Sequence, residues 1–112
     1  MKKIDAIIRP IRLEDVKIAL GEIGVVGMSV SDVRGMGSNH APSTAATGRS
    51  TLADMPIRIR IEIVARDEDV DDILRIIEIY ARTGEPGDGK IFVLPILEAI
   101  RVRTEERGDI VL

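Results

Sequence analysis

The sequence predicts a single α+β domain, and two observations lead to that prediction. The first is length: 112 residues supply enough apolar side chains for one core, and a second core would be short of them. The second is periodicity, because segments with apolar residues at every second position are interleaved with segments of helical spacing. Ile, Val and Leu must build the core, since Tyr80 and Phe92 are the only aromatic residues.

The first part of the chain reads as strand, helix, strand. Residues 2–10 alternate between apolar and polar side chains, which is the period of a half-buried strand, and a proline ends the run. From Leu13 to Ile23 the apolar residues recur at helical intervals, and Gly24 supplies the stop. Residues 25–33 return to a β-branched, alternating pattern, which predicts a second strand.

The second part repeats this order after an irregular segment. Residues 38–54 are rich in Ser, Thr, Ala and Gly and have neither period, so we expect a long mobile loop. Isoleucine at every second position makes 57–63 the clearest strand in the chain. Residues 67–82 carry a helical apolar stripe behind an acidic start. A glycine-rich turn then precedes a strand at 90–94.

Beyond that strand we expect a brief helical turn at 96–99 and renewed strand-like alternation at 100–103. The complete order is the double βαβ of a ferredoxin-like sandwich, formed by residues 1–112 as one domain. In that fold the helices cover one sheet face. The opposite face would carry Lys3, Asp5, Ile7, Arg58, Arg60, Glu62, Arg101 and Arg103. Such a mixed surface can pair with copies of itself around a symmetry axis, and three copies would hide all three sheets.

Composition excludes several classes of function. A formal net charge of -3 and the shortage of aromatic side chains argue against a nucleic-acid partner. The absence of cysteine excludes disulfides and thiolate metal sites. No apolar run is long enough for a membrane span or a signal peptide, so we expect a cytoplasmic protein without membrane insertion.

The turn at 83–90 is the first candidate site. Its glycines let the backbone approach a ligand, successive N–H groups can cradle phosphate oxygens, and Lys90 can neutralise their charge. The spacing is not that of a Walker motif. The alternative interpretation is a simple turn between helix and strand.

Arg101 and Arg103 form the second candidate site. On a strand, side chains at positions i and i+2 point to the same side, so the two guanidinium groups could bind one polyanion together. The alternative is a salt bridge to Glu62 or a similar acid. His40 is the only histidine and is interpreted as a solvated loop residue, and the acids of 67–72 as charges that compensate the helix dipole.

Several segments resemble the P-II signal proteins in order and spacing. They are Met-Lys-Lys-Ile-Asp-Ala-Ile-Ile-Arg-Pro at 1–10, Gly27-Met28, Gly35-Met36-Gly37, Ile-Glu-Ile-Val at 61–64, Thr-Gly-Glu-Pro-Gly-Asp-Gly-Lys-Ile-Phe-Val at 83–93, and Ile-Arg-Val-Arg-Thr at 100–104. The resemblance covers nearly the whole chain except 38–55, the family's T-loop. Residues 104–112 form a C-terminal segment.

The resemblance implies a homotrimer that binds ATP or ADP, with magnesium when ATP is bound, in three inter-subunit clefts. No catalytic residue is implied. The implied phosphate contacts are Gly87, Asp88, Gly89 and Lys90, with Arg101 and Arg103 reaching across from the neighbouring subunit. The implied loop base is Gly35 and Gly37, and the implied adenine and ribose pocket is Ile7, Gly27, Met28, Ser29, Glu62 and Val64.

Some positions depart from the family pattern. The family binds 2-oxoglutarate through ATP-held magnesium, a glutamine at the Asn39 position and a lysine at the Arg58 position. Asn39 is one methylene shorter and Arg58 has a different donor geometry, which weighs against 2-oxoglutarate as effector. Thr51 replaces the tyrosine that many relatives uridylylate, so that modification is not expected. Ser38 replaces a common arginine, and Ser29 keeps the hydroxyl of the usual threonine.

The function implied is that of a signalling adaptor. Nucleotide occupancy would change which T-loop conformations are populated, and the loop would present a surface to an unidentified target, a transporter or a metabolic enzyme. The alternatives are a P-II-like sensor of bicarbonate or a cyclic nucleotide, a small phosphoryl-transfer enzyme that uses His40, and a trimeric metal-binding or structural protein. A histidine in a mobile loop lacks the preorganisation that catalysis requires.

Overall fold

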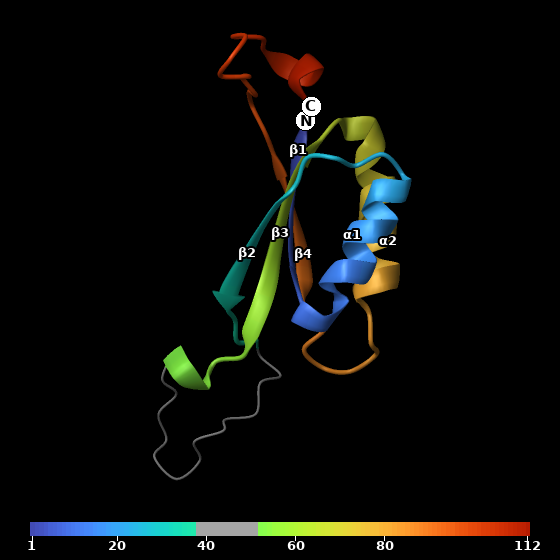
Figure 1. Ribbon diagram of the computed structural model, residues 1–112, viewed down its shortest axis with the longest axis vertical. Helices are drawn as coiled ribbons and strands as arrows, with labels where there is room; N and C mark the ends of the chain where they lie inside the picture. Colours follow the sequence, from blue (N-terminus) through green and yellow to red (C-terminus); the bar gives the residue numbers. More distant parts are fainter. Residues whose placement is uncertain (38–51) are drawn as a thin grey trace.

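The computed structural model describes residues 1–37 and 52–112 of the chain. It confirms the predicted α+β order (Figure 1). The main elements are β1 (Lys2–Ile8), α1 (Leu13–Glu22), β2 (Ser29–Arg34), β3 (Ile57–Ala65), α2 (Val70–Ala81) and β4 (Lys90–Pro95). Short 3-10 turns lie at Pro10–Arg12, Leu52–Asp54, Asp67–Asp69 and Gly108–Val111.

The four strands form one antiparallel sheet in the order β2-β3-β1-β4. The register places Ile4 of β1 opposite Ile63 of β3 on one side and opposite Val93 of β4 on the other. Figure 1 shows α1 and α2 side by side on one face of this sheet. The strand order and the single helical layer confirm the ferredoxin-like double βαβ sandwich.

The core lies between that helical layer and the sheet. β1 contributes Ile4, Ala6 and Ile8, and each of them is at most 2% exposed. The predicted alternation is thereby confirmed. The other buried apolar residues are Val16, Ala19 and Leu20 of α1, Ile59, Ile61, Ile63 and Ala65 of β3, and Val70, Ile73, Ile77 and Ala81 of α2.

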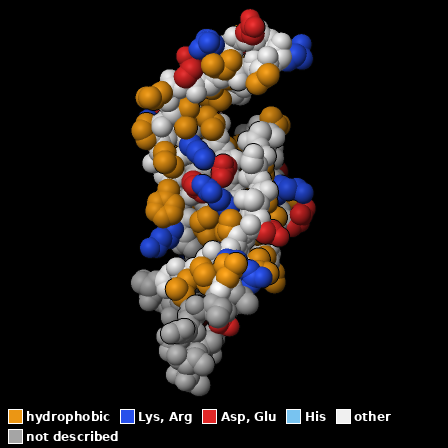
Figure 2. Space-filling model, turned by 90° about the vertical axis from the view of Figure 1, so that its left-hand side faces the viewer, with side chains coloured by type: hydrophobic (Ala, Val, Ile, Leu, Met, Phe, Trp, Pro, Cys, Tyr) orange, Lys and Arg blue, Asp and Glu red, His pale blue; other side chains and the backbone are white. Residues whose placement is uncertain are grey.

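The opposite sheet face carries a network of ion pairs, which Figure 2 shows as charges of both signs in the middle of the molecule. Arg60 Nη2 lies 2.6 Å from Asp5 Oδ2, and Arg60 Nε lies 3.0 Å from Glu62 Oε1. Lys3 Nζ lies 3.1 Å from Glu62 Oε2. Phe92 and Leu94 of β4 lie beside this network and are 55% and 43% exposed. The face is therefore a mixture of neutralised charge and open apolar surface.

The predictions beyond Pro95 were wrong. Residues 96–99 form no helical turn, and 100–103 form no strand: Ile100 makes a single bridge to Arg107, and a turn follows it. The turn closes on itself, since Gly108 N donates to Ala99 O at 2.9 Å. A strand needs a partner edge, and this segment finds only its own returning chain.

Two boundaries also differ from the prediction. β2 begins at Ser29, so residues 25–28 lie outside the strand. The predicted loop at 38–54 falls largely outside the described residues, and its described end, Leu52–Asp54, forms a 3-10 turn. No helix in the described ranges is long and apolar enough to cross a membrane.

Candidate functional site

A cleft of about 640 Å³ lies where the loop between α2 and β4 faces the residues that follow β2 and precede β3. It brings together eight of the residues singled out in the sequence. They are Ile7, Gly35, Gly37, Arg58, Gly87, Asp88, Gly89 and Lys90. The cleft thus joins the predicted phosphate loop to the predicted loop base.

The glycines of the phosphate loop are required by its backbone. Gly87 and Gly89 have φ values of +98° and +105°, which side chains on L-residues rarely tolerate. A Cβ on Gly89 would lie 1.7 Å from the carbonyl oxygen of Ile7, which leaves no room for one. The loop backbone therefore packs directly against the end of β1, in the cleft wall.

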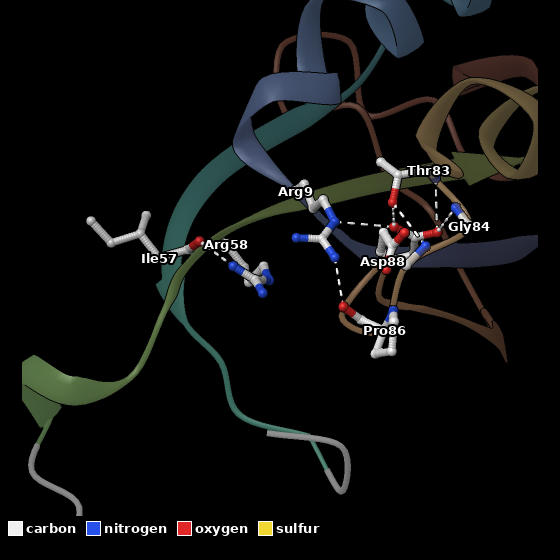
Figure 3. Close-up of polar contacts among 8 residues, drawn as sticks. Arg9, Ile57, Arg58, Thr83, Gly84, Pro86 and Asp88 are labelled. Atoms are coloured by element: carbon white, nitrogen blue, oxygen red, sulfur yellow. Dashed lines mark hydrogen bonds and ion pairs between the residues drawn. The ribbon is translucent and has the colours of Figure 1, made fainter. Parts of the chain in front are cut away.

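Asp88 organises the loop from within (Figure 3). Its carboxylate accepts hydrogen bonds from the backbone N–H groups of Thr83 at 2.8 Å and Gly84 at 2.9 Å, and from the Thr83 hydroxyl. The Thr83 hydroxyl is the main cause that holds the pKa of Asp88 far below its ordinary value, with help from both amides and from Arg9. The carboxylate stays ionised and closes the loop.

Arg9 joins this loop to the sheet. Its Nε donates to Asp88 Oδ1 at 3.0 Å, and its Nη2 donates to the carbonyl oxygen of Pro86 at 2.6 Å. Figure 3 shows the guanidinium facing both partners from the end of β1. Arg9 was not proposed as a site residue from the sequence. Its position between the predicted strand and Pro10 was the one feature that could have marked it.

Two further cations face the loop. Arg58 Nη2 lies 3.2 Å from the position of a Cβ on Gly87, while Arg58 Nη1 donates to Ile57 O at 3.0 Å. Lys90 is exposed and lines the same cleft. Among the residues described, neither Arg58 nor Lys90 forms an ion pair with a carboxylate. A cleft with two cations that form no ion pair with a described carboxylate fits an anion such as a phosphate group.

The remaining predicted residues lie away from this cleft. Ser29 pairs with Glu62 across β2 and β3, and Val64 lies opposite Lys3. Lys3 is four residues from Ile7, so Val64 lies about 13 Å along the sheet from the cleft, at about 3.3 Å per residue. Gly27 and Met28 precede β2 at the same end. The predicted adenine pocket is therefore divided within one subunit: Ile7 lines the cleft beside the 83–90 loop, and its other predicted members lie outside the cleft.

The prediction that Arg101 and Arg103 share a strand face was wrong, because both belong to the turn that follows β4. Arg101 Nη1 lies 2.6 Å from Glu106 Oε1, whereas Glu62 pairs with Lys3 and Arg60. The Thr104 hydroxyl, and then Arg101, lower the pKa of Glu106.

Asn39, the other candidate effector residue, lies outside the described residues. The cleft lining also includes residues to which the sequence analysis assigned no individual role: Met36, Pro56, Glu85, Pro86 and Phe92. No periodicity marks residues of this kind, because they come from three separate segments. Within 1–37 and 52–112, no group of three His, Asp or Glu side chains could hold a metal ion.

Comparison with known proteins gives one family. The family model described as nitrogen regulatory protein P-II matches residues 1–106. The nitrogen regulatory protein P-II of Nostoc punctiforme is 46% identical over 108 residues, covering 96% of each chain. Nitrogen regulatory protein P-II 1 of Escherichia coli K12 is 44% identical over 109 residues, covering 97% of each chain. The protein is a member of the nitrogen regulatory P-II family of signalling proteins.

Proposed function

We propose that the protein is a homotrimeric signalling adaptor that binds ATP or ADP in clefts between its subunits and thereby regulates a target protein. One observation carries the proposal: the residues expected to contact nucleotide fall into two groups, one that lines the cleft with the 83–90 loop and one that lies outside it, from Glu62 at the centre of the open sheet face to Val64 beyond it. Neither group alone surrounds a nucleotide. Two neighbouring copies would bring one group of each kind together.

The phosphate end is supported by the loop at 83–90. Gly87 and Gly89 bring backbone close to the cleft, and Lys90 and Arg58 supply positive charge. A planar guanidinium offers two parallel donors and an ammonium offers a compact charge, so together they suit a chain of phosphates. Backbone N–H groups and cations of this kind bind polyphosphate without any covalent chemistry.

The open sheet face supports assembly. Its central charges are already paired within the subunit, which reduces the cost of removing them from water. Phe92 and Leu94 add apolar area that would be buried against another copy. In the trimer, Arg101 would give up its ion pair with Glu106 and bind a phosphate in the cleft of the neighbouring subunit. Arg103 would reach the same ligand.

Gly35 and Gly37 would couple nucleotide binding to the target protein. Both line the cleft at the point where the chain leaves β2 toward the T-loop, so a bound nucleotide would contact the base of that segment. A ligand that favours one arrangement of this base shifts the conformations available to the loop. The loop would then present or withhold a surface for a transporter or metabolic enzyme.

The proposal includes no catalysis. With ATP, magnesium would be held mainly by phosphate oxygens, since the described residues offer no cluster of acids or histidines for it. Arg58 is a candidate contact for an effector carboxylate as well as for a phosphate, so 2-oxoglutarate belongs in the test as a separate ligand.

Calorimetry tests this function. The purified protein is titrated with ATP, ADP, AMP and, in the presence of magnesium and ATP, with 2-oxoglutarate and bicarbonate. We expect ATP and ADP to bind without phosphate release, and Lys90→Met to weaken ATP binding at least about 10-fold, as loss of a charge-assisted contact does. Lys17→Met is the control, because Lys17 lies on α1 and pairs with Glu14. Steady phosphate release, or indifference to every adenylate, would refute the proposal.

A further inference from the structure

We propose that Arg9 is the positioning residue of the phosphate loop: it fastens residues 83–88 to the end of β1 and so holds the cradle ready for an anion. This inference rests on the proposed function, since it concerns the same cleft. It assigns a role to a side chain 79 residues away from its loop partner in the sequence.

The contacts of Arg9 reach two points of the loop. One edge of the guanidinium binds the Asp88 carboxylate through Nε at 3.0 Å, and Nη2 binds the Pro86 carbonyl oxygen at 2.6 Å. The side chains of Arg9 and Asp88 are 25% and 24% exposed, so the ion pair is partly shielded from solvent. Charge-assisted bonds in such a place are stronger than exposed pairs.

Arg9 is itself held firmly. It directly follows β1, whose last residue Ile8 is 2% exposed in the core. Its backbone is extended, with φ of −69° and ψ of 139°, which is the conformation that a following proline favours. Pro10 then begins a 3-10 turn. The guanidinium therefore starts from a rigid point.

Arg9 acts through the loop instead of touching the ligand. It does not line the cleft, and two of its donors are already used by Asp88 and Pro86. Gly87 lies between these two contacts, and a Cβ there would be 3.1 Å from Arg9 Nη2. Arg58 Nη2 lies 3.2 Å from the same Cβ position, and Figure 3 shows the Arg9 guanidinium between Arg58 and the loop, so Arg9 supports the loop at the residue where the backbone turns.

The other bonds of Asp88 show what Arg9 adds. Thr83 and Gly84 donate to the same carboxylate, so these hydrogen bonds close the loop, and Arg9 holds in place the carboxylate that accepts them. Arg9 is the connection from this closed loop to β1, together with the backbone contact at Gly89. Without Arg9, the Asp88 carboxylate and the amides that donate to it would be less well fixed, and the loop would have to be ordered when the ligand binds, which lowers affinity.

The test compares Arg9→Met, Arg9→Lys and the control Arg75→Met. Arg75 also forms an arginine–aspartate pair at 3.0 Å, but on the surface of α2. Calorimetry is run with ATP and with adenosine, and amide hydrogen exchange is followed at Thr83 and Gly84. Ile61 in the core serves as the internal reference for folding.

We expect Arg9→Met to weaken ATP binding about 10-fold and adenosine binding less than about 2-fold, with faster exchange at Thr83 and Gly84. Arg9→Lys should recover part of the ATP affinity, because an ammonium can reach Asp88 or Pro86 but does not fork to both. In an Asp88→Asn background, Arg9→Met should add much less than it does alone.

Unchanged ATP affinity in Arg9→Met, or an equal loss for ATP and adenosine, would overturn the inference. If the unaltered protein binds no nucleotide, the proposed function fails. The exchange data then decide the inference separately: unchanged exchange at Thr83 and Gly84 in Arg9→Met would show that Arg9 does not hold the loop.

Discussion

Gly89 is a residue where the 83–90 loop packs directly against the end of β1. Its positive φ and the 1.7 Å approach of a Cβ position to Ile7 O allow no side chain. The backbone of the loop can therefore form part of the cleft wall. The same closeness makes this position sensitive to the smallest substitution.

Gly89→Ala should destabilise the fold by at least about 2 kcal/mol, from backbone strain and from the displaced loop, and should weaken ATP binding. Urea unfolding and calorimetry measure the two effects. Gly21→Ala is the control, since Gly21 lies in α1 with nothing within 4 Å of its Cβ position, and it should raise stability by up to about 1 kcal/mol. Equal stability of the two variants would contradict this account of Gly89.

Asp88 predicts a pH dependence. Its folded-state pKa is depressed below the ordinary value of 3.8, chiefly by the Thr83 hydroxyl. The stabilisation it supplies is therefore present above about pH 4 and is lost as pH falls below that value toward the folded pKa. Asp88→Asn should lose less stability than the unaltered protein between pH 5 and 2, measured by urea midpoints. Parallel pH curves for the two proteins would show that Asp88 makes no such contribution.

The sequence could identify several residues of the cleft, but it could not show which of them contact one another. Lys90 and the glycines could be identified because they are neighbours in the chain, and neighbours remain close in any fold. Arg9 and Asp88 could not be paired, since their contact depends on the sheet order that brings β1 beside β4. Arg58 was recognised by position, and only the fold places it over Gly87.

Among the elements, α2 has the most distinct inner and outer faces. Ile77 is fully buried between this helix and the sheet, whereas Ile79 on the same helix is 59% exposed. The spacing of apolar residues at i, i+3, i+4 and i+7 predicted this inward stripe. The central parts of helices and strands were predictable, because an element with one buried face has apolar residues at regular intervals in the sequence.

Ile77→Ala should lower the free energy of unfolding by about 2–5 kcal/mol, because it leaves a cavity in the core. Ile79→Ala is the matched control on the solvent side and should change stability by less than about 0.5 kcal/mol. Chemical denaturation followed by circular dichroism compares them. Similar losses for both variants would mean that α2 does not pack as described.

The elements that the sequence misplaced are those whose structure depends on a partner. Residues 100–103 alternate like a strand, but β4 ends at Pro95 and the chain beyond it turns back through Ile100 and Arg107. Residues 25–28 also have β-branched character, yet the ladder between β2 and β3 begins only at Ser29 and Glu62. The local pattern of apolar and polar residues does not show which strand edge a segment pairs with.

At the scale of the whole molecule, the open sheet face leaves apolar side chains exposed in a single subunit. Apolar residues such as Leu94 lie beside the ion pairs of Lys3 and Arg60. One group of predicted nucleotide contacts lines the cleft near Ile7, and the other extends from Glu62 at the centre of this face to Val64 beyond it. Assembly and ligand binding are therefore expected to depend on each other.

Leu94→Asp should shift the protein from trimer to monomer in sedimentation at micromolar concentration. The subunit should stay folded, because Leu94 lies opposite Lys3, which can pair with the new carboxylate. Ile18→Asp is the control, a 53% exposed residue on the helical layer, and should leave the trimer intact. A monomeric unaltered protein, or a trimeric Leu94→Asp variant, would rule out assembly through this face.

The most direct measurement mixes two kinds of subunit, each defective in a contact that a different one of the two neighbours would supply to the shared cleft. Lys90→Met subunits and Arg103→Met subunits are each expected to bind ATP weakly as pure trimers. After denaturation and joint refolding in equal amounts, about a quarter of the clefts would combine an unaltered loop with an unaltered arginine, and calorimetry should detect tight ATP binding at that fraction. Mixed trimers that bind no better than either parent would contradict a nucleotide site shared between subunits.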